Sequence, residues 1–262
     1  MDFNYAELNL QQRCERAGAW VNKMEKEHKN EILESIKGSK VYRENYKFDD
    51  VKPTGNNKTI KVVSKTTTEA AREIVENVNG RKVCALNFAS FKHPGGGFIR
   101  GALAQEEAIC HETDLYSILH YFEPTYYFDN FNNLNRAMYL DGAIYTPNVL
   151  SFDKDEKKIA FDVLTCAAPN WGAARRSGKF TEEDLRKVIH NRIEFMYNIL
   201  NEQKVDIAVL GAWGCGVFKL KAEMVAKEFE SLFGMLNCSA VIFAVPKSRT
   251  TDNYYRFMEV LG

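Results

Sequence analysis

The segment of this chain best suited to chemistry is a glycine triplet followed closely by two adjacent glutamates. The glycines are residues 95–97, and seven residues separate them from Gln105, Glu106 and Glu107. Consecutive glycines let the backbone take positive φ and let a ligand approach bare amide groups. Acidic residues following such a loop are typical of the first turn of a helix. Together the two parts predict a phosphate-binding loop beside an acid.

The two glutamates have an electrostatic explanation and a catalytic one. Carboxylates in a first helical turn interact favourably with the helix dipole, by about 0.3–1 kcal/mol each, whether or not they react. Successive helical side chains point about 100° apart, so Glu106 and Glu107 are not placed to flank a glycosidic bond from opposite faces. A catalytic pair would therefore divide the work. One carboxylate would hold a sugar hydroxyl, and the other would protonate the leaving oxygen and then deprotonate water.

The acid of such a pair requires a raised pKa. The helix N-terminus lowers the pKa of a carboxyl group by stabilising its charged form. Desolvation in a closed cleft, repulsion from the neighbouring carboxylate and repulsion from bound phosphates must outweigh that effect.

A second glycine-rich loop occupies an equivalent position. Residues 211–218 read GAWGCGVF and follow the apolar run 205–210, as the triplet follows the run 82–88. In open α/β folds, ligands bind beyond the carboxyl ends of strands. If the two strands are neighbours, the loops face each other across one cleft suited to a diphosphate. Each loop alone is also explained as a tight turn, and neither matches a dinucleotide-binding or P-loop signature.

Several polar and aromatic residues near these loops are weaker candidates. Asn87 and Ser90 end the first apolar run, where they would hydrogen-bond a ribose or form the turn. Asn148 and Asn170 also fit polar strand ends, with turn or capping roles as the alternative. Phe218 would pack on a ribose or base, or join the core.

Composition excludes several classes of function. Lys plus Arg and Asp plus Glu both total 35 of 262 residues, so there is no basic excess for non-specific nucleic-acid binding. The sequence has no apolar run long enough to cross a membrane and no secretory leader, which predicts an intracellular, cytoplasmic protein, or a nuclear one in a eukaryote. The six cysteines form no C-x-x-C pair and are expected to be reduced. His93, Cys110 and His111 lack a zinc signature, so we expect no metal.

The pattern of apolar runs predicts an α/β protein with a largely parallel sheet. Residues 5–38 are expected to be helical and a polar loop is expected around Pro53 to Asn57. Pro147 indicates an edge or irregular strand position. A capped helix is expected from Thr68. The remaining expected helices are 105–119, 181–202, 221–233 and one at the end of the chain, and the expected strands are 82–88, 143–152, 159–165, 205–210 and 240–245.

Four further segments occur in order with these motifs: ALNFAS at 85–90, TCAAPNWG at 165–172, GAWGCGVF at 211–218 and VIFAVPK at 241–247. With the GGG and QEE motifs, they make the chain resemble the bacterial-type poly(ADP-ribose) glycohydrolases over most of its length. The resemblance implies a macrodomain-like three-layer α/β/α sandwich with a mixed, largely parallel sheet. It implies a single domain over 1–262, with a helical N-terminal extension at 1–60 and a core at 61–262.

The resemblance also implies an activity and a set of site residues. The activity is hydrolysis of the ribose–ribose O-glycosidic bond of poly(ADP-ribose), mainly from the exposed chain end, with release of ADP-ribose and without a metal or cofactor. By position, Glu107 would be the catalytic acid/base and Glu106 would position the adjacent ribose hydroxyl. The substrate-binding residues would be Asn87, Ser90, Gly95, Gly96, Gly97, Phe98, Gln105, Gly214, Cys215, Gly216, Val217 and Phe218.

Two other functions are compatible with the same pair of glycine-rich loops. One is hydrolysis of a mono-ADP-ribosyl or O-acyl-ADP-ribose bond. The other is a non-catalytic module that binds ADP-ribose, which would need the loops but not both glutamates. The expected partners are poly(ADP-ribose) or ADP-ribose and ADP-ribosylated target proteins, with no sequence-specific nucleic acid and no membrane, and we expect a monomer.

Overall fold

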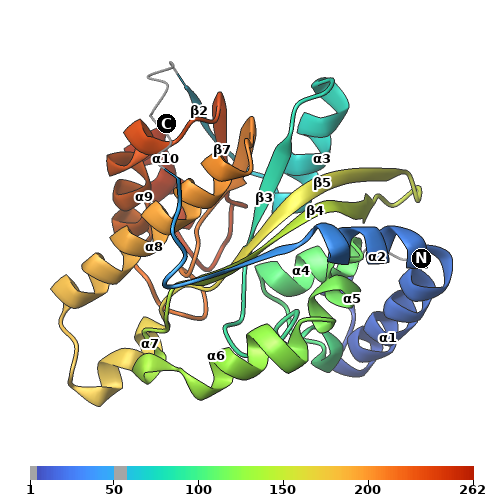
Figure 1. Cartoon of the computed structure of the whole chain (residues 1–262), viewed down its shortest axis with the longest axis horizontal. Helices are drawn as coiled ribbons and strands as arrows, with labels where there is room; N and C mark the ends of the chain where they lie inside the picture. The colour runs from blue at the N-terminus through green and yellow to red at the C-terminus, as the bar shows by residue number, and fades with distance from the viewer. Residues whose placement is uncertain (1–4, 50–57) are drawn as a thin grey trace.

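The computed structural model describes residues 5–49 and 58–262. In this part of the chain, seven strands form one sheet in the order β1-β4-β5-β3-β6-β7-β2, with helices on both faces (Figure 1). The pairs from β5 through β3, β6 and β7 to β2 are parallel, and the pairs β1–β4 and β4–β5 are antiparallel. This confirms the predicted α/β/α arrangement with a mixed, largely parallel sheet. The strands are β1 (Lys40–Arg43), β2 (Thr59–Val63), β3 (Val83–Phe88), β4 (Gly142–Phe152), β5 (Lys158–Cys166), β6 (Ile207–Leu210) and β7 (Ala240–Ala244).

The helices divide between the two faces of the sheet. One face packs against α8, α9 and α10, and the other packs against α1, α3 and α5. None of the helices in the described ranges has the length and apolar character needed to cross a bilayer. The α-helices are α1 (Leu10–Glu27), α2 (Lys29–Gly38), α3 (Thr67–Asn77), α4 (Gln105–Glu112), α5 (Leu115–His120), α6 (Phe128–Asn132), α7 (Trp171–Ala174), α8 (Glu182–Glu202), α9 (Ala222–Ser231) and α10 (Asn253–Leu261).

The strand β3 shows why the central parallel strands are mostly apolar. Successive side chains of a strand point to opposite faces of the sheet. Cys84 and Leu86 join the core under α8 and α9, whereas Val83 and Ala85 join the core under α1, α3 and α5. Because helices cover both faces, neither set of side chains reaches solvent. A buried strand of this kind reads as a continuous apolar run, which is why it was predicted correctly.

The N-terminal region is helical as predicted, and α2 ends at Gly38. The residues after it, however, add a strand to the sheet. Lys40–Arg43 form β1, which pairs antiparallel with β4 at one edge of the sheet. At the other edge lies β2, which the sequence analysis did not predict either. The predicted loop around Pro53 to Asn57 lies outside the described residues.

The predicted helix 105–119 is two helices. Between α4 and α5, Thr113 forms an isolated antiparallel bridge with Ser151 of β4. The N–H of Asp114 donates to the carbonyl of Leu150 at 3.1 Å, and the Leu150 N–H donates to Oδ1 of Asp114 at 3.0 Å. These bonds to the neighbouring strand interrupt the helical hydrogen bonding. Helical periodicity alone does not reveal such a break.

Two local predictions need adjustment. The cap of α3 is Thr66 rather than Thr68, because Thr66 and Glu69 form a reciprocal capping box at the required spacing of three residues. Pro147 lies in β4, between β1 and β5, so it is not on an edge strand. Its position is irregular as predicted, since the β4–β5 register shifts between Thr146 and Val149.

Candidate active site

The two glycine-rich loops line one cleft. They follow β3 and β6, which are neighbours and run parallel, with Val83 opposite Ile207. The cleft has a volume of about 680 Å³ and is lined by Gly96 from the first loop and by Gly214 and Gly216 from the second. The adjacency on which the sequence prediction depended is therefore confirmed. A cavity of this size suits a small ligand of nucleotide dimensions.

Glu106 is buried at the start of α4, with 3% of its surface exposed. Its Oε2 accepts a 2.7 Å hydrogen bond from the Ser90 N–H, and its Oε1 accepts a 3.2 Å hydrogen bond from the Asn87 side-chain amide. Burial raises the pKa of Glu106 to about 8, with a further contribution from the Glu107 carboxylate, and these effects outweigh the hydrogen bonds that lower it. Glu106 is thus a carboxyl group that takes up a proton near neutral pH.

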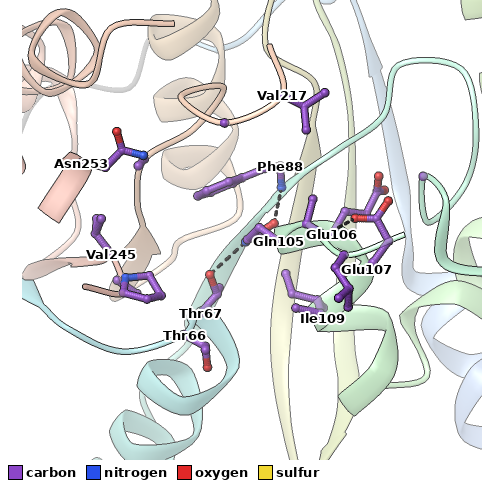
Figure 2. Close-up of a pocket in the computed structure, with 18 of the residues that line it drawn as sticks. Thr66, Thr67, Phe88, Gln105, Glu106, Glu107, Ile109, Val217, Val245 and Asn253 are labelled. Atoms are coloured by element: carbon purple, nitrogen blue, oxygen red, sulfur yellow. Dashed lines mark hydrogen bonds between the residues drawn. The ribbon is translucent and has the colours of Figure 1, made fainter. Parts of the chain in front are cut away.

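Glu107 is held by two backbone donors. Its Oε1 accepts from the Gly97 N–H at 2.7 Å, and its Oε2 accepts from the Ala104 N–H at 3.0 Å. The second bond caps the N-terminus of α4, which is the structural role that an acidic residue takes at this helical position. The first bond ties the carboxylate to the glycine triplet. Both glutamates line the cleft near Ile109, and Val217 lies across from them (Figure 2).

The glycine triplet lets the glutamates approach the backbone. Gly95 and Gly96 have φ of +62° and +60°, which favour glycine. A Cβ at Gly96 would stand 2.5 Å from Oε1 of Glu107 and 2.8 Å from Oε2 of Glu106. The N–H of Gly96 donates to the His93 carbonyl, and that of Gly97 donates to Glu107. The first loop therefore directs these two amides at protein groups, and its part in diphosphate binding stays a prediction.

The second loop leaves backbone donors unused. Among the hydrogen bonds of the described residues, none is donated by the N–H groups of Gly216, Val217 or Phe218. Gly216 and Val217 are exposed, Val217 to 73%, so this part of the loop lies at the surface of the cleft. Successive free N–H groups in a glycine-rich loop are typical of sites that bind phosphate oxygens. Of the two loops, this one offers the donors that a diphosphate requires.

Phe218 is supported by a small aromatic cluster. Its ring meets Tyr139 edge-on with 6.2 Å between centroids, and Tyr139 stacks on Phe91 at 4.3 Å. The backbone around Tyr139 is held by Arg192, which is buried on α8 and donates to the carbonyls of Ala167, Met138 and Tyr139. Arg192 also pairs with Asp141. The Phe218 ring is therefore fixed at the cleft wall.

Gln105 cross-links three elements with its amide. Its nitrogen donates to Thr67 Oγ1 at 2.9 Å and to the Leu86 carbonyl at 2.8 Å, and its oxygen accepts from the Phe88 N–H at 2.8 Å (Figure 2). These bonds join the starts of α3 and α4 to the end of β3. Gln105 lines the cleft, but all its polar atoms already have protein partners.

Five of the predicted binding residues do not line the cleft and lie behind the residues that do. They shape the wall: Asn87 holds Glu106, Gly97 holds Glu107, and Phe98 is fully buried against His111 and Tyr116. The lining itself contains Ser90, Gly96, Gln105, Gly214, Gly216, Val217 and Phe218, and the five behind it are Asn87, Gly95, Gly97, Phe98 and Cys215.

The other polar candidates have structural roles in this chain. Asn170 caps α7 by accepting from the Ala173 N–H at 3.0 Å, and Asn148 occupies the irregular part of β4 with φ of +54°. Burial, and then the nearby Arg16, lower the pKa of His111 to about 3. Burial also raises the pKa of the Cys110 thiol well above its usual value, so neither side chain is an activated nucleophile or base.

One wall of the cleft was not predicted from the sequence. The carboxyl ends of parallel strands meet at the same edge of a sheet, so the segments after β2 and β7 reach the site as well. Figure 2 shows Val245 and Asn253 at the end of the cleft away from the glutamates, with Phe88 between. The strand β7 was predicted, and the polar residues that follow it were the signal available. The missed wall includes Thr66, Thr67, Thr68, Val245, Ser248 and Asn253.

Residues 12–154, more than half of the chain, match the family described as the catalytic domain of microbial-type PARG, or poly(ADP-ribose) glycohydrolase. The chain belongs to this family. It is therefore an enzyme, a poly(ADP-ribose) glycohydrolase, as the GGG and QEE motifs indicated. A comparison with curated proteins finds no matching relative.

Solved structures of this family have the same fold. The glycohydrolase from Thermomonospora curvata is 28% identical, with a TM-score of 0.85 over 96% of this chain and 100% of that chain. The same enzyme bound to the inhibitor ADP-HPD is 28% identical, with a TM-score of 0.82 over 95% and 99%. The glycohydrolase from Deinococcus radiodurans in complex with ADP-ribose is 30% identical, with a TM-score of 0.75 over 87% and 96%.

Proposed function

We propose that this chain shortens poly(ADP-ribose) mainly from its exposed end and releases ADP-ribose, with Glu107 as the acid/base and Glu106 as the residue that positions the ribose. The observation that carries the proposal is the placement of both glutamates on the first turn of α4, at one end of a cleft closed by two glycine-rich loops. A module that only binds ADP-ribose needs the loops and has no use for two buried carboxylates.

The division of roles between the glutamates is supported by their positions. Glu106 is held by Asn87 and Ser90 and is buried beneath the loop after β3, which suits a residue that accepts a hydrogen bond from a ribose hydroxyl. Glu107 would protonate the oxygen of the leaving ribose as the glycosidic bond breaks, and would then deprotonate the attacking water. For this, Glu107 exchanges its bond with the Gly97 amide for one with substrate. The raised pKa of Glu106 makes the opposite assignment the alternative to be tested.

The two ends of the cleft have different chemistry. The amides of Gly216, Val217 and Phe218 would bind the diphosphate, and the Phe218 ring would order the terminal ribose next to Glu106. The adenosine would then extend toward Val245 and Asn253. This orientation places the scissile bond at the glutamate end. The solved relative from Deinococcus radiodurans is in complex with ADP-ribose, which supports ADP-ribose as a ligand of this cleft.

The test is release of ADP-ribose from defined poly(ADP-ribose), together with calorimetric binding of ADP-ribose. Glu107→Gln is expected to lower kcat by roughly 10³-fold while the Kd for ADP-ribose stays within about twofold. Glu106→Gln is expected to weaken ADP-ribose binding as well as turnover. Glu34→Gln, on the exposed surface of α2, is the matched control.

The outcomes separate the alternatives. If Glu106→Gln alone abolishes turnover while binding survives, the two roles are exchanged and the glycohydrolase proposal stands. If the wild-type chain binds ADP-ribose but releases none from the polymer, the proposal is wrong. Accumulation of oligomers rather than monomer in early product profiles would contradict cleavage from the exposed end.

We also propose that the chain acts as a single-domain monomer inside the cell, on ADP-ribosylated proteins. The N-terminal helices α1 and α2 pack on the same face of the sheet as α3 and α5, which supports one folding unit. The six cysteines are all free thiols, as expected in a reducing compartment. A sedimentation velocity experiment tests the oligomeric state, and a second, faster species would contradict a monomer.

A further inference from the structure

The loop between β3 and α4 carries positive charge and no negative charge. Residues 89–104 contain Lys92, His93 and Arg100 and not a single Asp or Glu, in a chain whose formal net charge is zero. We propose that this basic loop is a second phosphate-binding site, which holds the diphosphate of the polymer unit on the leaving side of the scissile bond. The inference rests on the proposed function, because it assigns a place to the part of the polymer that the main cleft does not hold.

Arg100 is hydrogen-bonded to the backbone of the glycine triplet and does not line the cleft. Its N–H donates to the Gly97 carbonyl at 2.9 Å, and its guanidinium Nη2 donates to the Gly96 carbonyl at 3.2 Å. The N–H of the same Gly97 donates to Glu107. The guanidinium thus lies on the outer side of the loop whose inner side holds the proposed acid/base. Its remaining donors face solvent, since Arg100 is exposed.

Lys92 and His93 are held on the same loop. Their N–H groups both donate to Ser90 Oγ, at 3.3 and 3.2 Å, and the Ser90 N–H donates to Glu106. Burial, and then the charges of Arg100 and Lys92, lower the pKa of His93, so both charges act on the His93 ring. The backbone of the loop that carries these three basic residues is therefore hydrogen-bonded to both glutamates.

The negative charges near this loop do not neutralise it. The carboxylate that acts on the pKa of His93 is Glu123, and Glu123 already lies 3.0 Å from Nδ1 of His120. Within the described residues, neither Lys92 nor Arg100 forms a salt bridge. Two permanent positive charges are therefore available to an anion that approaches from solvent.

Given the direction of the cleft, the polymer unit on the leaving side of the scissile bond would extend toward this loop. Figure 2 shows Val245 and Asn253 at one end of the cleft and Glu106 and Glu107 at the other. A donor ADP-ribose that fills the cleft places its reactive ribose at the glutamates, so the rest of the polymer must leave past that end. Gly96 lines this end of the cleft, and its carbonyl accepts a hydrogen bond from the Arg100 guanidinium. The alternative exit passes over Val217 and Lys219 of the second loop.

The unit on the leaving side brings a diphosphate with it. Exposed cations attract such a group over a distance set by the ionic strength, and they affect association and binding more than the bond-breaking step. The site is therefore expected to lower KM for the polymer and to leave kcat and the affinity for free ADP-ribose unchanged, because free ADP-ribose occupies only the main cleft.

The experiment compares the double variant Lys92→Glu/Arg100→Glu with Arg186→Glu, a charge reversal on the exposed side of α8 at the opposite face of the sheet. For the double variant, KM for poly(ADP-ribose) is expected to rise roughly tenfold, kcat to stay within about twofold and the Kd for ADP-ribose to stay within about twofold. The rise of KM with added NaCl should be shallower than in the wild type. Arg100→Lys, which keeps the charge, should retain most of the wild-type KM.

Each contrary result has a distinct meaning. An unchanged KM in the double variant, or a rise of KM confined to Lys219→Glu, overturns the proposal, and the second result places the leaving unit over the other loop. An equal loss of ADP-ribose affinity shows that the basic loop belongs to the main cleft and also overturns it. A wild-type chain that fails to cleave the polymer would instead refute the proposed function.

Discussion

The backbone N–H of Gly97 donates a 2.7 Å hydrogen bond to Oε1 of Glu107. The adjacent Gly96 is so close that a Cβ there would meet the same oxygen. The glycine triplet is therefore the support for the proposed acid/base as well as a wall of the cleft. This relationship explains the short spacing between the triplet and the two glutamates in physical terms, because the loop must return its backbone to the first turn of α4.

Replacement of Gly96 by alanine should disrupt this support. The new methyl group would lie 2.5 Å from Glu107 Oε1 at a residue with φ of +60°. Gly80→Ala is the control, since Gly80 has φ of +69° but nothing within 4 Å of its Cβ position. Both variants should lose about 1 kcal/mol of unfolding free energy from the backbone conformation. Only Gly96→Ala should also lower polymer hydrolysis, by at least roughly tenfold, and equal activities in the two variants would contradict this account.

Glu106 should make stability depend on pH. Its pKa of about 8 in the folded state is raised above the ordinary value of 4.5, so its stabilising contribution is fully present below pH 4.5 and is lost as the pH rises toward 8. Glu106→Gln removes this pH-dependent loss of stability, because a glutamine side chain does not ionise. Relative to the wild type, the variant should therefore gain stability between pH 5 and pH 9, on the order of a few kcal/mol.

Urea unfolding of both proteins at several pH values measures this difference. Burial also raises the pKa of Asp114 to about 8, but Asp114 is present in both proteins and its effect cancels in the comparison. A difference between the two proteins that does not vary with pH would show that Glu106 remains ionised in the folded state.

Arg192 should be required for the stability of the segment that supports Phe218. Arg192→Met leaves Asp141 without its partner and removes three donors to backbone carbonyls, which should cost about 3 kcal/mol of unfolding free energy. Asn135, Arg136, Ala137 and Tyr139 all have positive φ, so the segment has little stability of its own. Arg256→Met, which removes the exposed ion pairs of Arg256 with Asp252 and Glu259, is the control and should have no measurable effect. Equal unfolding midpoints would contradict this role.

The Gln105 side chain should stabilise the fold and should not contact the ligand directly. Gln105→Ala leaves the Phe88 N–H and the Leu86 carbonyl without their partner, at an expected cost of about 1–3 kcal/mol. Gln11→Ala removes an exposed side-chain bond to Glu15 and should change stability by less than about 0.5 kcal/mol. Thermal unfolding measures both. If Gln105→Ala weakens ADP-ribose binding without loss of stability, Gln105 contacts the ligand directly.

Elements buried on both sides were predictable and edge elements were not. The strands β3, β6 and β7 are mostly apolar, because helices cover both faces of the sheet, so local composition identifies them. The strand β1 is Lys-Val-Tyr-Arg, and it becomes a strand by pairing with β4 about a hundred residues later. Likewise the break at Thr113 depends on Ser151. Hydrogen bonds between distant segments leave no periodic signal in either segment.

Within the site, the charged residues could be predicted from the sequence, but the hydrogen-bond partners of the site residues could not. The pair Glu106 and Glu107 follows from the motif alone. That Asn87 and Ser90 bind Glu106, and that Gln105 is occupied by Thr67, Leu86 and Phe88, depends on how α3 and α4 pack against the end of β3.

The sequence by itself determined the family, the two glycine-rich loops and the two glutamates, because local motifs of glycine and acidic residues carry that information. The tertiary structure alone decided that β3 and β6 are neighbours, which brings the loops together over one cleft. It also decided that burial raises the pKa of Glu106 and that Arg100 is exposed on the side of the glycine triplet opposite Glu107. Burial and proximity are created by packing of segments far apart in the chain, so they exist only in the folded molecule.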